Sequence, residues 1–462
     1  SVPAADALAT AERELVRSTR AESAVEDAMT LDEFCDQDFA AIDWIVPDLL
    51  ARDDRLVITG MEGFGKALAL DTPIPTPSGW TTMGDLRSGD AVLGCDGKPC
   101  RVVHAMPVQH GRPCYRVRFS DGSSIVADER HEWLTETLRA RESTAKAARR
   151  DPTTKPRGTD QRYNRRHFPA VVETGQIRDT LWARDGFALN HSIATCEPLE
   201  LPDVALPIDP YTLGAWLGDG SSSGAQITIH PDDHEILDRI RAAGYTVTKH
   251  KPQYLWGISR KEAKDAAKAR AAGLVASGVS IRASLRMVGI DRRSAGMVPI
   301  RSLVEELRDL GVLGNKHIPA EYLRASHAQR LALVQGLLDT DGSVGKSGHV
   351  EFCSVSRDLA EGFLEAVLSL GVKATVRASD AVLNGRTVGT RYRVTFATDL
   401  PVFHLSRKRA RLGSVSRRAK LRYITAVEPV ESVPVRCIEV DSPDHLFLAG
   451  RAFIPTHNSV WM

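Results

Sequence analysis

Gly60-Met-Glu-Gly-Phe-Gly65-Lys66 is the stretch that decides how this chain is organised, because Ala67 follows it. A phosphate-binding loop needs two glycines separated by four residues, a lysine, and then at once a serine or threonine whose hydroxyl binds magnesium. The missing hydroxyl stands at Ser459, followed only by Val-Trp-Met. Joining Lys66 to Ser459 restores the loop, so residues 67–458 are interpreted as an insert.

The composition indicates a soluble globular protein. The 462 residues suffice for about three domains, and 42% of them are apolar and 26% charged. We find neither an apolar run long enough to span a membrane nor an apolar signal core, and therefore expect a cytoplasmic monomer with no membrane partner. The seven cysteines form no CxxC pair. This argues against a disulfide framework and against a structural zinc site.

The net charge of +1 conceals an asymmetry, since residues 1–66 hold 6 Lys/Arg and 15 Asp/Glu. Two stretches of the insert are strongly basic. Residues 139–166 carry ten Lys/Arg against three acids, and residues 407–420 carry seven and no acid. They are either solvated loops or a groove for a nucleic-acid backbone. Tyr163, His167 and Phe168 accompany the first stretch, which would extend a DNA footprint.

Both ends of the insert predict a β-rich fold. Prolines at Pro73, Pro75 and Pro77 mark turns. Short alternating runs follow at close spacing, at 92–93, 101–104, 114–119 and 124–127. The insert closes with Pro455-Thr-His-Asn458, immediately before Ser459. These two ends resemble the splicing element of inteins, which excises itself from a host protein.

The downstream junction has the groups that such a reaction needs. Ser459 supplies a hydroxyl nucleophile, and Asn458 can attack its own carbonyl through its side-chain amide. His457 and His445 can donate or accept protons near neutral pH. The resemblance implies that no cofactor takes part in splicing.

The upstream junction departs from the usual pattern, because an alanine methyl at Ala67 cannot start an acyl shift. Cys437, Trp133 and Thr456 resemble the signature of class 3 inteins, which lack the first nucleophile. Taken singly, each of these residues, like His131, could equally be structural. The family usually has a Thr-x-x-His motif, but in this chain Asp128 stands in place of the threonine. Which residue assists His131 therefore stays open.

The resemblance implies a route through a branched intermediate. Cys437 would attack the Lys66 carbonyl while His131 helps the Ala67 amide to leave. Ser459 would then take over the acyl group, and Asn458 would cyclise. A lowered thiol pKa at Cys437 is expected from Arg436 or a histidine.

An internal repeat lies between the two ends. Residues 212–220 and 334–342 both resemble the LAGLIDADG motif of homing endonucleases. Asp209-Pro210 and the capping box at Ser326 each predict the start of a helix, and each motif lies at the end of the helix that begins there. The resemblance implies that Asp219 and Asp341 hold Mg²⁺ at the scissile phosphates and that Lys316 stabilises charge or activates water. We identify no second lysine from sequence.

The expected fold is a mainly β Hint horseshoe plus an α+β endonuclease domain with pseudo-two-fold symmetry. The expected boundaries are a host fragment at 1–66, the first splicing part at 67–200 with a basic extension near 137–187, the endonuclease at 201–405, the second splicing part at 406–458, and a host fragment at 459–462. The host fragments resemble RecA-like replicative helicase ATPases of phages or bacteria. Gly60, Gly65, Lys66 and Ser459 would bind nucleotide only after splicing.

Two alternatives stay open: a precursor that acts only as a DNA-binding nuclease, and a helicase-type ATPase with an inert insertion. Ala67 and the few residues after the insert speak against the ATPase. The expected partners are the host sequences in cis and double-stranded DNA, namely the intein-free allele of the host gene. The endonuclease is either active or a decayed domain that keeps its fold.

Overall fold

The computed structural model describes residues 66–149, 168–183, 186–251, 254–260, 269, 271–281, 283–284, 302–383 and 386–458, with the backbone of β1 (Trp44–Val46) and β2 (Leu50–Ala51) before them. Gly60, Gly65 and Ser459 lie outside this part. The chain divides into two compact units, Ser1–Gly60 and Met61–Met462, and the sites below lie in the second. Among the described residues, no helix is long and apolar enough to cross a membrane.

The two ends of the insert fold together into one β-rich domain. Its strands, which include all four expected runs, are β3 (Leu68–Ala69), β4 (Pro73–Thr76), β5 (Gly79–Thr82), β6 (Ala91–Leu93), β7 (Pro99–Ala105), β8 (Cys114–Phe119), β9 (Ser124–Asp128), β10 (Glu132–Thr135), β11 (Ala170–Glu173), β12 (Ser192–Ala194), β20 (Leu421–Val430), β21 (Val435–Arg436), β22 (Ile438–Val440), β23 (Leu446–Ala449) and β24 (Ile454–His457). The expectation of a mainly β domain at both ends is therefore confirmed.

The largest sheet of this domain interleaves strands from the two ends. Its order is β12-β20-β8-β9-β3-β21, so β20 and β21 from the C-terminal part flank strands of the N-terminal part. The inward residues alternate along β8, as expected for a sheet with one buried face. Its core joins Leu68 and Trp133 to Ile438, Phe447 and Ile454. Neither end can form this core alone.

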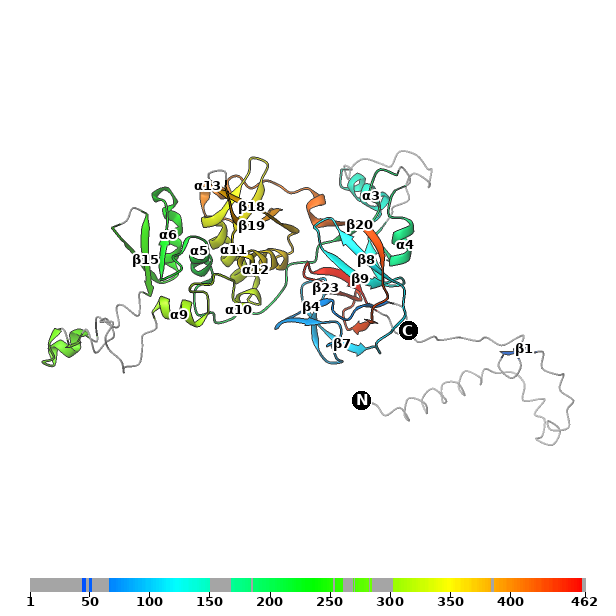
Figure 1. The fold of residues 1–462 in the computed structure, drawn as a ribbon, viewed down its shortest axis with the longest axis horizontal. Helices are drawn as coiled ribbons and strands as arrows, with labels where there is room; N and C mark the ends of the chain where they lie inside the picture. Colours follow the sequence, from blue (N-terminus) through cyan, green and yellow to red (C-terminus); the bar gives the residue numbers. More distant parts are fainter. Residues whose placement is uncertain are drawn as a thin grey trace, which may run out of the picture. The chain divides into compact units, whose positions relative to one another are not determined.

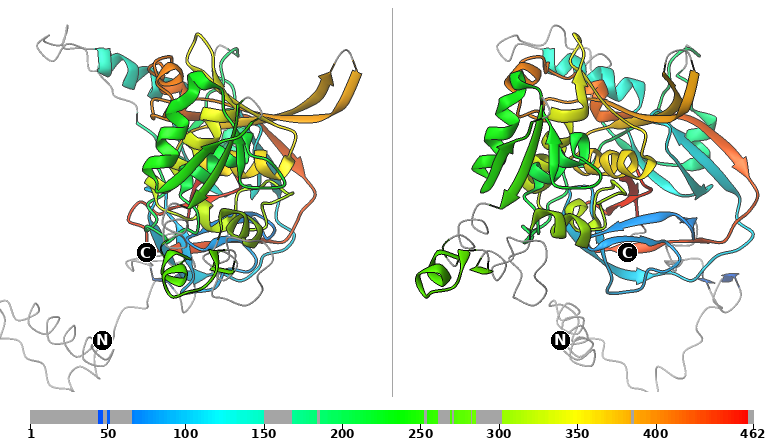
Figure 2. Two further views of the ribbon diagram at one scale, coloured as in Figure 1. Left: turned by 90° about the vertical axis from the view of Figure 1, so that its left-hand side faces the viewer. Right: turned by 60° about the vertical axis from the view of Figure 1, so that its left-hand side comes forward.

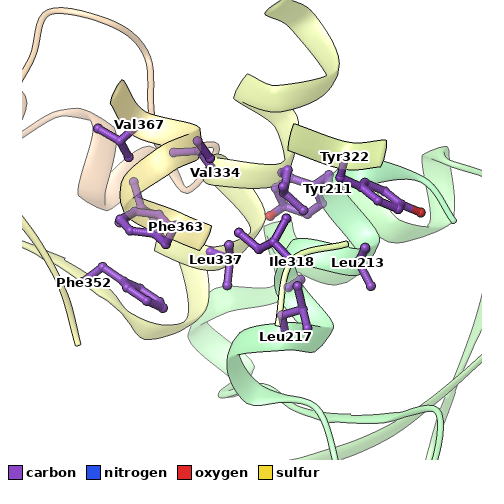
Figure 3. Close-up of a cluster of buried hydrophobic side chains, with 14 of the residues drawn as sticks. Tyr211, Leu213, Leu217, Ile318, Tyr322, Val334, Leu337, Phe352, Phe363 and Val367 are labelled. Atoms are coloured by element: carbon purple, nitrogen blue, oxygen red, sulfur yellow. The ribbon is translucent and has the colours of Figure 1, made fainter. Parts of the chain in front are cut away.

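The second domain is built on a pair of helices, α5 (Pro210–Asp219) and α11 (His327–Asp341) (Figure 1). The expected starts are confirmed: the Asp209 side chain accepts from the Thr212 N–H, and Ser326 with Gln329 forms a complete capping box. Figure 3 shows Leu213 and Leu217 of α5 close to Leu337 of α11 in one apolar cluster. We call this the paired-helix domain.

Each helix is followed by the same succession of elements. The first half has β13 (Gln226–Thr228), α6 (His234–Ala242), β14 (Tyr245–Lys249) and β15 (Leu255–Arg260). The second has β16 (Gly342–Val344), β17 (His349–Ser354), α12 (Arg357–Ser369), β18 (Ala374–Leu383) and β19 (Arg386–Ala397). The sheet orders are β13-β15-β14 and β16-β17-β19-β18. Apart from β16, the strands correspond in this order: β13 to β17, β15 to β19 and β14 to β18. This confirms the expected duplication, and the β18–β19 hairpin of the second half projects from its domain (Figure 2).

A glycine follows each helix of the pair. Gly220 and Gly342 have φ angles of −74° and −93°, which other residues also adopt. The reason for glycine is space, because a Cβ would stand 2.2 Å from the Trp216 carbonyl oxygen at Gly220 and 2.5 Å from that of Leu338 at Gly342.

Polar contacts join the two domains through one indole. The Trp80 Nε1–H of β5 donates to Glu365 of α12 at 2.9 Å, and Arg324 donates to the same carboxylate at 2.7 Å. The guanidinium of Arg451, in the β23–β24 turn, lies 4.3 Å from the centre of the Trp80 ring. This tryptophan therefore connects the turn before the downstream junction to the paired-helix domain.

The remaining elements are η1 (Pro231–Asp233), α3 (Leu138–Arg149), α4 (Thr174–Asp179), α9 (Leu303–Asp309), α10 (Ala320–Leu323), α13 (Ser406–Arg409) and η2 (Arg417–Lys420). In the part of the two basic stretches that the structure describes, Arg141 and Lys408 are buried. Arg141 of α3 is buried and donates to the Glu136 and Asn190 carbonyls, both at 2.8 Å. Residues 150–167, with Tyr163 and His167, lie outside the described residues.

Candidate functional site

The upstream junction lies inside the main sheet. Ala67 is fully buried just before β3, whose Leu68 pairs with Arg436 and whose Ala69 pairs with Val435 of β21. Because partners in an antiparallel ladder step in opposite directions, the next pair along is Ala67 and Cys437. Both belong to one buried cluster. The fold thus brings Cys437 to the bond that it was expected to attack.

The arginine beside this cysteine is engaged elsewhere. The Arg436 guanidinium donates to the carbonyls of Gly84, Leu86 and Met106 at 2.8–3.0 Å. It therefore stabilises the strand's position, whereas the sequence suggested that it would favour the Cys437 thiolate.

His131 lies between the two junctions. Its Nε2 is hydrogen-bonded to the hydroxyl of Thr456, which is fully buried in β24. Burial lowers the pKa of His131 to about 3, and a backbone hydrogen bond with Lys66 opposes this shift. Since only an acceptor raises the pKa of an imidazole, that group is the Lys66 carbonyl. The ring is therefore neutral, and its Nδ1 has no hydrogen-bond partner among the described residues.

Trp133 and Thr174 fix the orientation of this imidazole. The buried indole stands edge-on to the His131 ring, with 4.8 Å between ring centres. Its Nε1–H donates to the Thr174 hydroxyl at 2.9 Å, and that hydroxyl donates to the His131 carbonyl at 3.0 Å. The expected orienting residues are thus brought together with His131, although they come from distant parts of the sequence.

Asp128 supports the backbone of His131, and its side chain does not face the ring. Its carboxylate accepts from Arg112 Nε at 2.6 Å and from the Arg130 N–H at 2.7 Å. The His131 N–H donates to the Asp128 carbonyl at 3.1 Å. The departure from the family pattern is accommodated by a buried ion pair with Arg112.

The downstream junction is held by backbone contacts. The His457 Nδ1–H donates to the Asn458 carbonyl oxygen at 2.6 Å, and the Asn458 side-chain Nδ2 donates to Val440 O at 3.1 Å. Asn458 is fully buried, and its Oδ1 has no hydrogen-bond partner among the described residues. The Asn458 N–H donates to the His445 carbonyl at 2.8 Å. The carbonyl to be attacked is therefore already polarised by an imidazole.

A carboxylate that sequence reasoning missed reaches both junctions. Glu132 Oε2 lies 3.1 Å from the Lys66 Nζ and 3.4 Å from the His457 Nδ1. Burial lowers the pKa of His457, the Glu132 charge raises it, and the Lys66 charge lowers it. The only signal in the sequence is the position of Glu132 between His131 and Trp133.

The paired helices end in two carboxylates. Asp219 closes α5 and Asp341 closes α11, at the positions where the two helices meet. Partial burial, and then repulsion from Asp219, raise the pKa of Asp341 to about 6. Partial burial also raises the pKa of Asp219. Two carboxylates, completed by substrate phosphates, are a usual Mg²⁺ environment, so these residues fit the expected ion.

Two lysines lie at these helix ends. The Lys316 Nζ donates to the Gly218 carbonyl of α5 at 2.7 Å. The buried Lys408 of α13 donates to the carbonyls of Leu338, Asp339 and Gly342 at 2.7–2.8 Å, at the end of α11. Burial lowers the pKa of Lys408 to about 8. Lys408 is thus a second lysine beside the helix ends, which the sequence did not reveal, and the expected boundary between 405 and 406 falls just before α13, which carries it.

Comparisons with known proteins give one match to the paired-helix domain alone and others to longer parts of the chain. Residues 328–404 match the LAGLIDADG-like domain family. A replicative DNA helicase DnaB of Mycobacterium intracellulare is 42% identical over 411 residues, 87% of this chain and 60% of the relative. The homothallic switching endonuclease of Saccharomyces cerevisiae is 25% identical over 191 residues, 38% of this chain and 30% of the relative. The chain thus spans less than two thirds of the length of these relatives.

Among solved structures, the zinc-bound splicing domain of the Msm DnaB1 intein is matched over its whole length and over 85% of this chain, with 19% identity and a TM-score of 0.25. The alignment with the mycobacterial helicase is far longer than the 66 residues before the insert and the four after it, so most of it lies within residues 67–458. That insert closes its own ends in one sheet and contains the LAGLIDADG-like match.

The insert interrupts a sequence similar to DnaB helicases directly after the lysine of a phosphate-binding loop. Of the expected splicing residues, Cys437, His131, Trp133, Thr456, His457, His445 and Asn458 come together in the β-rich domain. Ser459 lies outside the described residues.

Proposed function

We propose that this chain is an intein and that it splices by the class 3 route. The reaction begins with attack of Cys437 on the Lys66 carbonyl. The sulfur forms a thioester with the carbonyl carbon, the C–N bond to Ala67 breaks, and the thiol proton ends on the Ala67 nitrogen. The observation that carries the proposal is the β3–β21 register, which sets Cys437 opposite Ala67. Alignment of this kind converts attack across the chain into a local step.

His131 acts on the electrophile in this step. The ring contacts the Lys66 backbone, where a donor would stabilise the oxyanion that develops on the attacked carbonyl. The unpartnered Nδ1 of the same imidazole takes the proton from the thiol and passes it to the leaving Ala67 nitrogen. Thr456 and Trp133 are positioning residues, because they contact His131 and hold the plane of its ring.

The downstream steps follow from the second set of contacts. The Ser459 hydroxyl attacks the thioester, which returns the sulfur of Cys437 and leaves the host fragment as an ester. The Asn458 Nδ2 then bonds to its own carbonyl carbon, the bond to Ser459 breaks, and a proton passes to the Ser459 nitrogen. His457 supports this step through its hydrogen bond to the Asn458 carbonyl. An O-to-N shift completes the Lys66–Ser459 peptide bond.

Replacement of the proposed nucleophile tests the route. The purified Cys437→Ala chain should form no upstream cleavage product and no joined host peptide, whereas a Cys100→Ala control should keep both. Mass spectrometry of timed samples separates precursor, branched intermediate and products. Joined host fragments from the Cys437→Ala chain would exclude direct attack by this cysteine.

We propose further that the LAGLIDADG domain cuts double-stranded DNA, with the intein-free host gene as its target. Asp219 and Asp341 would hold Mg²⁺, which supplies charge stabilisation at the scissile phosphates. Lys316 and Lys408 lie at the ends of α5 and α11. Each would face one strand of the duplex, whose phosphate backbone favours positive charge.

The nuclease and splicing activities should be separable. The double variant Asp219→Asn, Asp341→Asn should lose cleavage of a plasmid that carries the uninterrupted host sequence, yet splice at the rate of the unchanged chain. Loss of both activities would contradict two independent sites, and absence of cutting by the unchanged chain would favour a decayed nuclease. ATP hydrolysis by the joined host protein remains a property to test after splicing.

A further inference from the structure

Glu132 is the charged group in the β-rich domain that contacts residues of both junctions. Its Oε2 is shared between the Lys66 ammonium at 3.1 Å and the His457 imidazole at 3.4 Å. Lys66 precedes the upstream bond, and His457 donates to the carbonyl of the downstream bond. The side chains of all three are at least three-quarters shielded from solvent, so the interaction is only weakly screened.

Other titratable groups surround Glu132 and His457. Glu132 pairs across the β10–β11 ladder with Glu173, a like charge on the same face of the sheet. Lys66 and His457 are the groups that offset this repulsion. On the other side of His457 stands His445, with 6.2 Å between the ring centres. The titratable groups facing His457 are thus Glu132, Lys66, His445 and the neutral His131, with Glu173 behind Glu132.

We propose that Glu132 is a positioning residue shared by both junctions, and that through it Lys66 of the host loop restrains premature cyclisation of Asn458. The inference rests on the proposed splicing reaction and adds a control by the host residue. An imidazolium at His457 would donate a stronger, charge-assisted hydrogen bond to the Asn458 carbonyl than a neutral ring. Glu132 favours that cation, and Lys66, held on the same oxygen, disfavours it.

The chemistry of the restrained step is unchanged. Asn458 Nδ2 forms its bond to the Asn458 carbonyl carbon, and the Ser459 nitrogen leaves with a proton. What the lysine changes is the fraction of His457 that is protonated when this occurs. An intein inserted after a lysine thereby keeps its downstream bond intact while the upstream acyl group is still in place.

The test measures downstream cleavage alone, in full chains that carry Cys437→Ala so that upstream attack is blocked. Release of Ser459-Val-Trp-Met is followed by mass spectrometry. Lys66→Met should accelerate this release about 3–10-fold near pH 7 and move its pH dependence to higher pH, because the opposing charge is gone. Lys66→Arg, which keeps the charge, should restore the slow rate. Lys98→Met is the matched control, since Lys98 is exposed and its ammonium lies beside Glu200 instead of Glu132.

A double-variant cycle assigns the effect to Glu132. Glu132→Gln should slow release and reduce the effect of Lys66→Met to less than about twofold, because Lys66 is then no longer held beside His457. Melting curves identify any variant that does not fold, and Glu132→Asp supplies a second, charge-preserving replacement. An unchanged rate in Lys66→Met, or a full effect that persists without Glu132, would overturn the inference. Failure of the splicing route itself would appear separately, as joined product from the Cys437→Ala chain.

Discussion

Asp341 is the residue whose protonation the fold changes in a way that a stability measurement can detect. Partial burial and the nearby Asp219 raise its pKa to about 6, above the ordinary value of about 3.9 for an unfolded chain. The folded state therefore binds this proton more tightly, and stability falls as the pH rises from about 4 to 6. These charges are tolerated because a cation and DNA would compensate them.

Asp341→Asn should consequently stabilise the metal-free protein at neutral pH. The gain should reach on the order of 1 kcal/mol, since the exposed helix end screens much of the repulsion, and it should vanish near pH 4. Urea unfolding at pH 4 and pH 7.5 measures both values. Asp203→Asn, an exposed carboxylate before α5, serves as the control. Equal stability of the variant and the unchanged chain at pH 7.5 would contradict the repulsion.

Thr456→Val tests whether the hydrogen bond between Thr456 and His131 matters. The valine keeps the shape of the buried side chain but removes the hydroxyl that is hydrogen-bonded to His131 Nε2. Formation of the Cys437 thioester should slow about 10–100-fold, at the lower end of general acid–base contributions. Quenched samples treated with hydroxylamine report the thioester. Thr456→Ser should retain most of the rate, and a valine variant as fast as the unchanged chain would show that this contact is only structural.

At the scale of elements, the α5–α11 pair shows how sequence pattern becomes close packing. A Cβ on Gly214 would stand 2.2 Å from the Leu333 carbonyl oxygen, and one on Gly336 would stand 2.2 Å from that of Tyr211. The two backbones are in direct contact, which fixes the separation of Asp219 and Asp341 at the helix ends. Asp339, the extra acid of the second motif, accepts from the Tyr211 hydroxyl at 2.7 Å and the Leu405 N–H at 3.1 Å, so it supports packing.

Gly214→Ala should therefore separate the helices and destabilise the LAGLIDADG domain by about 3 kcal/mol, with loss of DNA cutting. Gly224→Ala is the control, because nothing lies within 4 Å of a Cβ there. Urea unfolding followed by tryptophan fluorescence gives the free energies. If the two alanine variants were equally stable, the close approach of the helices would be wrong.

At the scale of the whole molecule, the β-rich domain accommodates a second domain without separating its own ends. The insertion leaves the β-rich domain after β12 and returns at β20, and these two strands pair with each other, Ser192 with Tyr423 and Ala194 with Leu421. The entry and exit of the LAGLIDADG domain therefore lie side by side on one sheet. Trp80, between Arg324 and Arg451, provides a further connection.

Trp80→Ala should uncouple the two domains while leaving each folded. Loss of the Glu365 hydrogen bond and of both stacked guanidiniums should cost about 2–4 kcal/mol of coupling and split one thermal transition into two. Calorimetry of the Cys437→Ala precursor measures this. Trp182→Ala, an exposed indole elsewhere on the β-rich domain, is the control. A single transition in Trp80→Ala would show that other contacts couple the domains.

Local features could be predicted because they depend on neighbours in the sequence. The caps at Asp209 and Ser326 and the strand at 114–119 were predicted in this way and are confirmed. Glu132 and Lys408 could not be predicted, since a carboxylate between two site residues and one lysine among seven cations have no distinguishing local pattern. The direction of the Arg436 guanidinium could not be predicted for the same reason, because it depends on carbonyls distant in the chain. The lowered pKa expected at Cys437 stays a prediction.

The sequence by itself determined the interrupted phosphate-binding loop, the absence of a nucleophile at Ala67 and the duplicated helix motifs, because each is a matter of residue identity and spacing. Only the tertiary structure decided that Cys437 lies opposite Ala67, that His131 connects Lys66 to Thr456, and that one carboxylate reaches both junctions. These pairings join opposite ends of the insert. Strand register and burial fix them, and both arise only when the whole sheet forms.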